Sequence, residues 1–272
     1  SVWGEAASEE RLAREGLAAY ARHPLLRAVG LDRTFYAPLP AAELARLAAQ
    51  VPEDFSFLVK AWQAFTSPAL PGAAAAARNA RFLDAARAAD EVVAPAAEGL
   101  GRRLGAILFQ LPPLSPKEVA ALGGPEALVD RLAAFLASLP RGPRYAVELR
   151  TRALLGPRYR EALAAAGAAH SYVVHPSMPG VAAQAAVVPP SAGPAVLVRW
   201  MLGHGLGYER ARERYAPFDR LAAPDPASRA GIAELCRAAL ALEKDVVVVV
   251  NNKAEGSAPR SVFALAEAIA GG

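Results

Sequence analysis

Polar side chains that ionise or donate hydrogen bonds stand at the ends of the short apolar segments of this sequence. In chain order they are Asp32, Lys60, Gln110, Glu148, Arg150, His175, Arg199, Asn251 and Asn252. Lysine and arginine bind phosphate and carboxylate groups, amides orient neutral oxygens, and carboxylates and imidazoles transfer protons. If the apolar segments are neighbouring parallel strands, these side chains converge and predict a binding site for a small anion.

Glu148 and Arg150 carry the clearest chemical signal, because residues two apart on a strand share one face. Burying either charge alone is costly, so the pattern predicts that the two side chains meet beside a polar cavity. In the catalytic interpretation Glu148 is the general acid or base, and His204 is a second proton carrier near neutral pH. A structural ion pair beneath the loops is the alternative interpretation, and the sequence leaves both open.

The remaining strand-end side chains are assigned to substrate binding. The predicted binding residues are Lys60, Gln110, Arg150, His175, Arg199, Asn251 and Asn252. Each has an alternative interpretation. Lys60 could be a surface lysine whose amine reaches solvent, the two asparagines could form a turn, and Gln110 could support loop backbone. The sequence has no tight cluster of histidines and carboxylates and no zinc-type spacing of Cys and His, so we predict no metal, and nothing identifies a cofactor.

Three other chemically versatile side chains are predicted to be structural. His170 begins a strand pattern, away from the end where the polar groups gather. His23 falls at the end of a helical pattern, where an imidazole caps free carbonyl groups. Cys236 is the only cysteine and lies in an amphipathic helical pattern, which predicts a buried thiol and excludes an internal disulfide.

Strand and helix patterns alternate along most of the chain. Strands are predicted over 28–36, 55–60, 104–110, 145–150, 170–175, 195–200 and 246–250. Helices are predicted over 8–23, 41–50, 72–89, 95–103, 115–121, 125–138, 158–166, 208–221, 227–242 and 259–270. Repeated strand–helix units imply a parallel sheet, and the valines of the last strand predict a strand buried on both faces.

Two architectures fit this alternation, an open doubly wound sheet and a (β/α)8 barrel. The absence of a Gly-x-Gly-x-x-Gly motif after an early strand disfavours the dinucleotide-binding sheet. A barrel requires eight strands, and the place for the missing one is before Ser8. We therefore expect residues 1–272 to form a single TIM-type barrel domain that lacks, or has a truncated, first strand.

Composition restricts the partners. The chain has 272 residues, 54% of them hydrophobic, a net charge of +4 and a pI of about 9.4. This modest basic excess permits nucleic acid or phosphate partners without requiring them. The N-terminus lacks a signal-peptide pattern, and prolines interrupt the charge-free stretch from Ala162 to Val198, so a soluble cytoplasmic protein is expected.

Several of these segments together resemble the YecE-like family, known as domain of unknown function 72. The matching segments are Asp32–Pro40 (DRTFYAPLP), Phe55–Lys60 (FSFLVK), Leu104–Pro113 (LGAILFQLPP), Tyr145–Arg150 (YAVELR), Arg199–Gly205 (RWMLGHG) and Val247–Ser261 (VVVVNNKAEGSAPRS). The resemblance implies a (β/α)8 barrel and no established activity. Two features depart from the family pattern: its Gly-rich first strand is missing, and Asp32-Arg33 replaces its usual Asn-Ser.

Three functions remain as hypotheses. The first is an enzyme acting on a small anionic substrate at the carboxyl ends of the strands. The second is a nucleic-acid-binding or processing barrel that uses arginines and the aromatic residues Trp62, Trp200, Tyr208 and Tyr215. The third is a non-catalytic scaffold or binding protein, which the missing strand and the altered Asp32-Arg33 pair favour. The sequence does not predict an oligomeric state.

Overall fold

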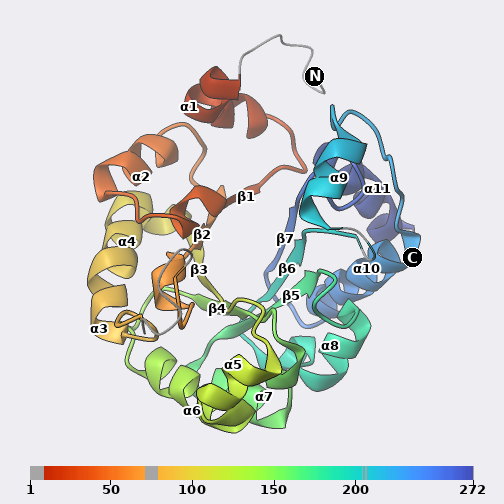
Figure 1. Cartoon of the computed structure of the whole chain (residues 1–272). Helices are drawn as coiled ribbons and strands as arrows, with labels where there is room; N and C mark the ends of the chain where they lie inside the picture. Colours follow the sequence, from red (N-terminus) through yellow and green to blue (C-terminus); the bar gives the residue numbers. More distant parts are fainter. Residues whose placement is uncertain (1–8, 71–78, 204, 206, 272) are drawn as a thin grey trace.

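Seven strands follow one another around a nearly closed barrel in the order in which they occur in the chain, and every neighbouring pair is parallel (Figure 1). The computed structural model describes residues 9–70, 79–203, 205 and 207–271. The strands are β1 (Ala28–Leu31), β2 (Ser56–Lys60), β3 (Leu104–Gln110), β4 (Tyr145–Glu148), β5 (Ala169–Val174), β6 (Val196–Trp200) and β7 (Val246–Val250). The prediction of a TIM-type barrel one strand short is confirmed for the described part of the chain.

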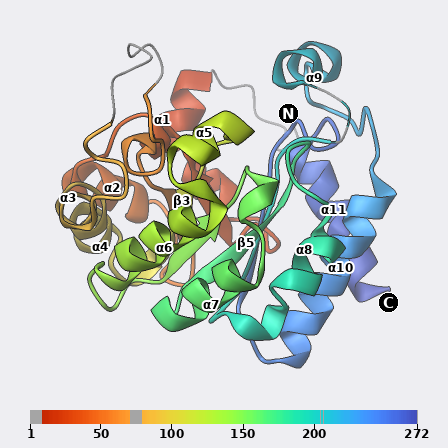
Figure 2. The same ribbon diagram turned by 60° about the horizontal axis from the view of Figure 1, so that its bottom comes forward.

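Helices cover the outside of the strands, and α9 stands apart from the ring formed by the others (Figure 2). They are α1 (Glu9–Tyr20), α2 (Ala41–Ala48), α3 (Ala85–Ala88), α4 (Ala94–Leu100), α5 (Pro116–Ala121), α6 (Gly124–Ala137), α7 (Pro157–Ala166), α8 (Val181–Val187), α9 (Tyr208–Tyr215), α10 (Pro226–Ala241) and α11 (Ala258–Ala270). Several of these helices have a proline in their first turn. At the start of α5, Ser115 and Glu118 form a capping box. No helix among the described residues is long and apolar enough to cross a membrane.

Several predicted element boundaries are wrong. The strand predicted over 145–150 ends at Glu148, and the helix predicted over 8–23 ends at Tyr20. The strand predicted over 28–36 ends at Leu31, because Asp32–Phe35 forms a 3-10 turn. The helix predicted over 208–221 ends at Tyr215, because Pro217 forces the preceding residue out of the helical conformation. Of the helix predicted over 72–89, the structure describes residues from 79 onward. In this part the helix begins only at Ala85, the first residue of α3, where Asp84 caps the first turn.

Small and aliphatic side chains fill the barrel interior. They are Leu58, Ala106, Leu108, Ala146, Ala169, Ala195 and Leu197, with Val249 packed against them. Because side chains alternate along a strand, the next inward positions toward the carboxyl ends are Lys60, Gln110, Glu148 and Arg199. The apolar interior is therefore the floor beneath a layer of polar and charged side chains.

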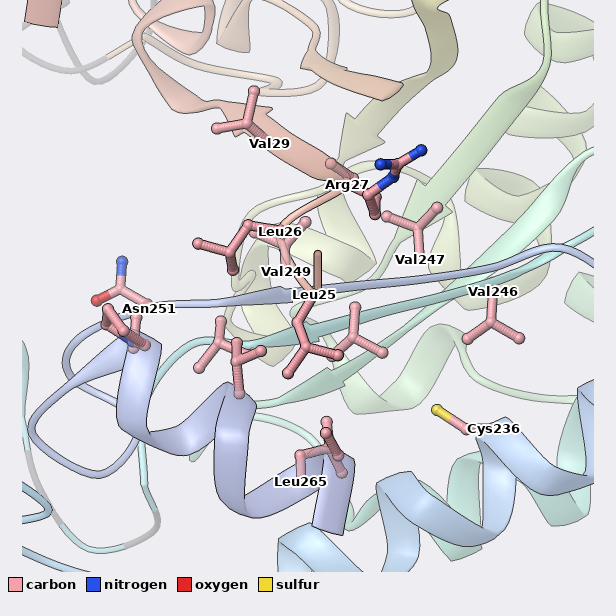
Figure 3. A pocket seen from close by; sticks show the side chains of 18 of the residues that line it. Leu25, Leu26, Arg27, Val29, Cys236, Val246, Val247, Val249, Asn251 and Leu265 are labelled. Carbon is pink, nitrogen blue, oxygen red and sulfur yellow. The ribbon is translucent and has the colours of Figure 1, made fainter. Parts of the chain in front are cut away.

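The barrel is open between β1 and β7, which share no backbone ladder in the described structure. An apolar cleft of about 550 Å³ occupies this opening, lined by β1, β7 and parts of α10 and α11 (Figure 3). The prediction that Val246–Val250 is buried on both faces is wrong, since all five valines are only half-buried. The physical reason is that β7 is an edge strand, with β6 on one side and the cleft on the other.

Candidate functional site

Glu148 is the centre of the polar layer and is fully buried at the end of β4. Its Oε1 accepts hydrogen bonds from Arg150 at 2.6 Å, and its Oε2 accepts one from Arg199 Nη1 at 2.9 Å. Burial alone would raise the pKa of Glu148, but the Arg199 and Arg150 guanidinium groups outweigh it and lower the pKa. Glu148 is thus a carboxylate at neutral pH, shared by two arginines.

Arg199 links strands from opposite sides of the barrel. It is 2% exposed and reaches from β6 to Glu148 on β4 and to Gln110 on β3, where Nη1 lies 3.4 Å from the amide oxygen. Its Nη2 donates to Asp32 Oδ1 at 2.7 Å, just after β1. Burial would lower the pKa of Arg199, but Glu148 and Asp32 raise it overall, so the side chain remains a cation. Arg199 therefore crosses the mouth of the barrel.

Lys60 ends β2 beside this network, yet it forms none of its ion pairs. Its Nζ lies 3.6 Å from the centre of the Phe35 ring, and among the described residues no carboxylate lies within ion-pair distance. Burial, followed by the positive charge of Arg199, lowers the pKa of Lys60 to about 8, although Asp32 and Glu148 act in the opposite direction. The amine is thus a cation without a paired anion at the barrel mouth.

The layer as a whole carries an excess of positive charge. Two carboxylates, Asp32 and Glu148, meet three cations, Lys60, Arg150 and Arg199, which leaves a net charge of +1 when all are ionised. The arginines are occupied by carboxylates, whereas the lysine is not. An anion that entered the mouth would therefore balance the charge by approaching Lys60.

The asparagines after β7 shape the loop that follows it. Asn251 Oδ1 accepts the backbone N–H of Lys253 at 3.0 Å, and Asn252 Oδ1 accepts that of Ala258 at 2.8 Å. The Asn251 contact is that of an Asx turn, whereas the Asn252 contact ties the loop to the start of α11, six residues on. Asn251 also lines the cleft between β1 and β7 (Figure 3).

Of the two candidate histidines, the structure describes His175, which lies in the turn after β5. The Nδ1 of His175 lies 2.9 Å from Ser177 Oγ and accepts the Ser177 backbone N–H at 3.2 Å, in the turn after β5. His204 lies outside the described residues. These His175 contacts belong to a turn. The assignment of His175 to substrate binding and that of His204 to proton transfer stay predictions.

Of the three residues predicted to be structural, His170 and Cys236 are confirmed as buried, whereas the capping of helix carbonyls by His23 stays a prediction. His170 is buried between the Tyr159 hydroxyl at 3.0 Å and the Gln184 amide oxygen at 3.2 Å, and burial lowers its pKa to about 4. Cys236 is buried on α10, and burial raises the pKa of its thiol to about 11. His23 accepts the Leu25 backbone N–H at 3.2 Å, just beyond the end of α1.

Sequence reasoning missed the role of Asp32 as a partner of Arg199. The only signal was its place at a strand end in the Asp32-Arg33 pair that departs from the family pattern. The structure separates that pair: Asp32 completes the charged layer, whereas Arg33 turns outward and binds Glu43 at 2.7 Å. Sequence reasoning also missed the buried pair of Glu255 with Arg229, which fastens the loop after β7 to α10.

Metal ligands do not gather in the described structure. Among the residues it covers, no group of three or more histidine, cysteine, aspartate or glutamate side chains lies close enough to hold an ion. The carboxylates of the barrel mouth have arginine partners instead. The arrangement is suited to binding a negatively charged ligand through cationic and amide groups.

Fold and site define a class: a parallel barrel of TIM type with a charged layer at the carboxyl ends of its strands. The sequence profile described as "Protein of unknown function DUF72" matches residues 1–271, and the chain belongs to this family. The resemblance inferred from the strand-end motifs is therefore confirmed. No curated protein matches the chain.

Solved structures of the same family share the fold. A DUF72 family protein of Enterococcus faecalis V583 is 18% identical, with a TM-score of 0.60 over 93% of each chain. A second structure of that protein gives 19% identity and a TM-score of 0.64 over 97% of this chain and 93% of the other. A DUF72 family protein of Thermotoga maritima MSB8 is 19% identical, with a TM-score of 0.60 over 98% of this chain and 92% of the other. These likenesses show the fold alone.

Proposed function

We propose that this DUF72 protein binds a small phosphate- or carboxylate-bearing molecule at the carboxyl ends of its strands. The single observation that supports it concerns the Lys60 amine. Among the described residues this cation has no carboxylate partner, whereas the neighbouring Arg150 and Arg199 both pair with Glu148. A buried or half-buried charge is stabilised by a counter-charge, and the network lacks one for Lys60 among the described residues. An anionic ligand supplies it.

Three other groups bear on how the ligand is held. The Gln110 and Asn251 amide N–H₂ groups have no acceptor among the described residues, so both are available to neutral or charged ligand oxygens. Arg150 uses Nε and Nη2 on Glu148, which leaves Nη1 for a ligand. Glu148 itself is covered by the arginines, so the role we assign to it is to hold their guanidinium groups in place.

Titration calorimetry with inorganic phosphate at low ionic strength tests this proposal. Lys60→Met keeps most of the side-chain volume and removes the charge, and should weaken binding by about ten- to a hundredfold, as expected for loss of one charge-assisted hydrogen bond. Lys117→Met is the matched control, since Lys117 is exposed on α5 and its loss changes the net charge equally. Equal phosphate affinity in wild type and Lys60→Met would contradict the proposal.

A scaffold role is the second candidate, and the Arg199 crossing of the barrel mouth favours it. Side chains that already satisfy one another fill the mouth without a ligand. In that case phosphate would bind neither wild type nor Lys60→Met measurably. The nucleic-acid candidate has less support, because Trp200 and Tyr215 are buried and cannot stack on bases, whereas Tyr208 is 58% exposed.

A further inference from the structure

The four lysines of the chain have very different surroundings. Lys117 is exposed, and Lys253 lies over the Tyr208 ring, 4.0 Å from its centre. Lys244 donates from Nζ to three backbone carbonyls, those of Pro190, Ser191 and Gly193. Lys60 alone extends from an interior-facing position of a barrel strand, and the described residues offer its amine no hydrogen-bond acceptor.

We propose that Lys60 is a nucleophilic amine that forms an imine with the carbonyl group of a small anionic aldehyde or 2-oxo acid bound at the barrel mouth. This inference rests on the proposed anion site and names the class of its ligand. A lysine amine becomes a nucleophile toward carbonyls where desolvation and neighbouring cations disfavour its protonated form.

The geometry supplies both conditions. Burial desolvates the Lys60 amine, and the Phe35 ring lies on one side of it with its centre 3.6 Å from Nζ. Arg150 and Arg199 act on the amine as like charges, and they are fixed in position by Glu148. The resulting pKa of about 8 raises the neutral fraction at pH 7 more than about a hundredfold over an ordinary lysine.

The reaction needs no co-reactant. The neutral amine attacks the carbonyl carbon, a C–N bond forms, and the carbonyl oxygen leaves as water with two protons from the original ammonium group. Lysine ammonium plus carbonyl thus gives iminium plus water, with no net uptake or release of protons. The iminium carries the same single positive charge as the ammonium, so Asp32 and Glu148 stabilise it as they do Lys60.

The arginines give the carbonyl compound its orientation. A carboxylate attached to the carbonyl carbon, as in glyoxylate and 2-oxo acids, is drawn to the Arg150 guanidinium, which retains an Nη1 donor, while the carbonyl lies toward Lys60. A molecule without the anionic group lacks this anchor. The site should therefore prefer glyoxylate to acetaldehyde at equal concentration.

Reductive trapping tests the inference on the folded wild-type protein. Glyoxylate with sodium cyanoborohydride at pH 7 converts an imine into a stable carboxymethyl-lysine, which peptide mapping by mass spectrometry locates. We expect Lys60 to be labelled at least about tenfold faster than Lys117 and Lys253, with a rate that rises as pH approaches 8. Labelling of Lys60 at the rate of Lys117 would overturn the inference.

Two variants and one competitor separate the imine from the anion site. Lys60→Arg keeps the positive charge and cannot form an imine, so it should still bind phosphate and show labelling only at the background rate. Lys253→Arg should be labelled as the wild type is. If phosphate binds wild type but Lys60 is not labelled, the imine inference fails while the anion site stands. If phosphate neither binds the wild type nor slows the labelling of Lys60, the proposed anion site fails, and the imine inference that rests on it fails too.

Discussion

Replacing Glu148 by glutamine removes one charge from the centre of the barrel mouth and leaves both arginines without it. At contact distances of 2.6 and 2.9 Å, each ion pair is worth about 6 kcal/mol before desolvation is counted, if the effective dielectric constant is about 20. Since Arg150 and Arg199 stay buried, the expected loss is about 3–5 kcal/mol in the free energy of unfolding. This loss is a large part of the free energy of unfolding of a typical protein, which is about 5–15 kcal/mol.

Urea unfolding at pH 7 measures this loss as a lower midpoint at an unchanged slope. The pKa of Glu148 is lower in the folded protein, so its stabilising effect is present above the unfolded-state pKa of glutamate and is lost as pH falls through the folded value. The difference in free energy of unfolding between wild type and Glu148→Gln should therefore become smaller below about pH 4. A variant within about 0.5 kcal/mol of wild type at pH 7 would refute this reasoning.

Three further predictions concern groups outside the barrel mouth. Gly256→Ala should destabilise the protein by at least about 2 kcal/mol in urea unfolding, because φ is +117° and a Cβ would lie 2.6 Å from the Arg220 carbonyl oxygen; an unchanged midpoint would contradict it. His170 has a folded pKa of about 4, so wild-type stability should fall as pH drops from about 6.5 toward 4, and His170→Asn should lack that slope. Native Cys236, with a pKa of about 11, should resist iodoacetamide at pH 7.5 until urea unfolds the chain, and rapid native alkylation would disprove its burial.

The barrel and the centre of the site could be predicted from local signals. Alternating strand and helix patterns predict a parallel sheet, and the two-residue spacing predicts that Glu148, the last residue of β4, and Arg150, just beyond it, meet. Parallel strands bring Lys60, Gln110 and Arg199 to the same end, and the contacts of Arg199 with Gln110 and Glu148 bear this out.

The remaining features depend on tertiary contacts that no single segment encodes. The partner of Asp32 is Arg199, 167 residues away, and only the curling of the sheet into a barrel brings them to 2.7 Å. The exposure of the β7 valines follows from the opening beside β1, whereas their sequence is typical of a strand with neighbours on both sides. The Asn251 and Asn252 carbonyl oxygens could equally have faced a ligand, and the backbone path of the loop decided otherwise.

The central claim is that the barrel mouth receives an anion at Lys60. Crystals soaked in selenate test it directly, because the selenium of this phosphate-like anion is located by its anomalous scattering. We expect a peak whose oxygens lie within hydrogen-bond distance of Lys60 Nζ and Arg150 in wild type, and we expect its loss in Lys60→Met. Selenate bound only at surface arginines, with none at the barrel mouth, would contradict it.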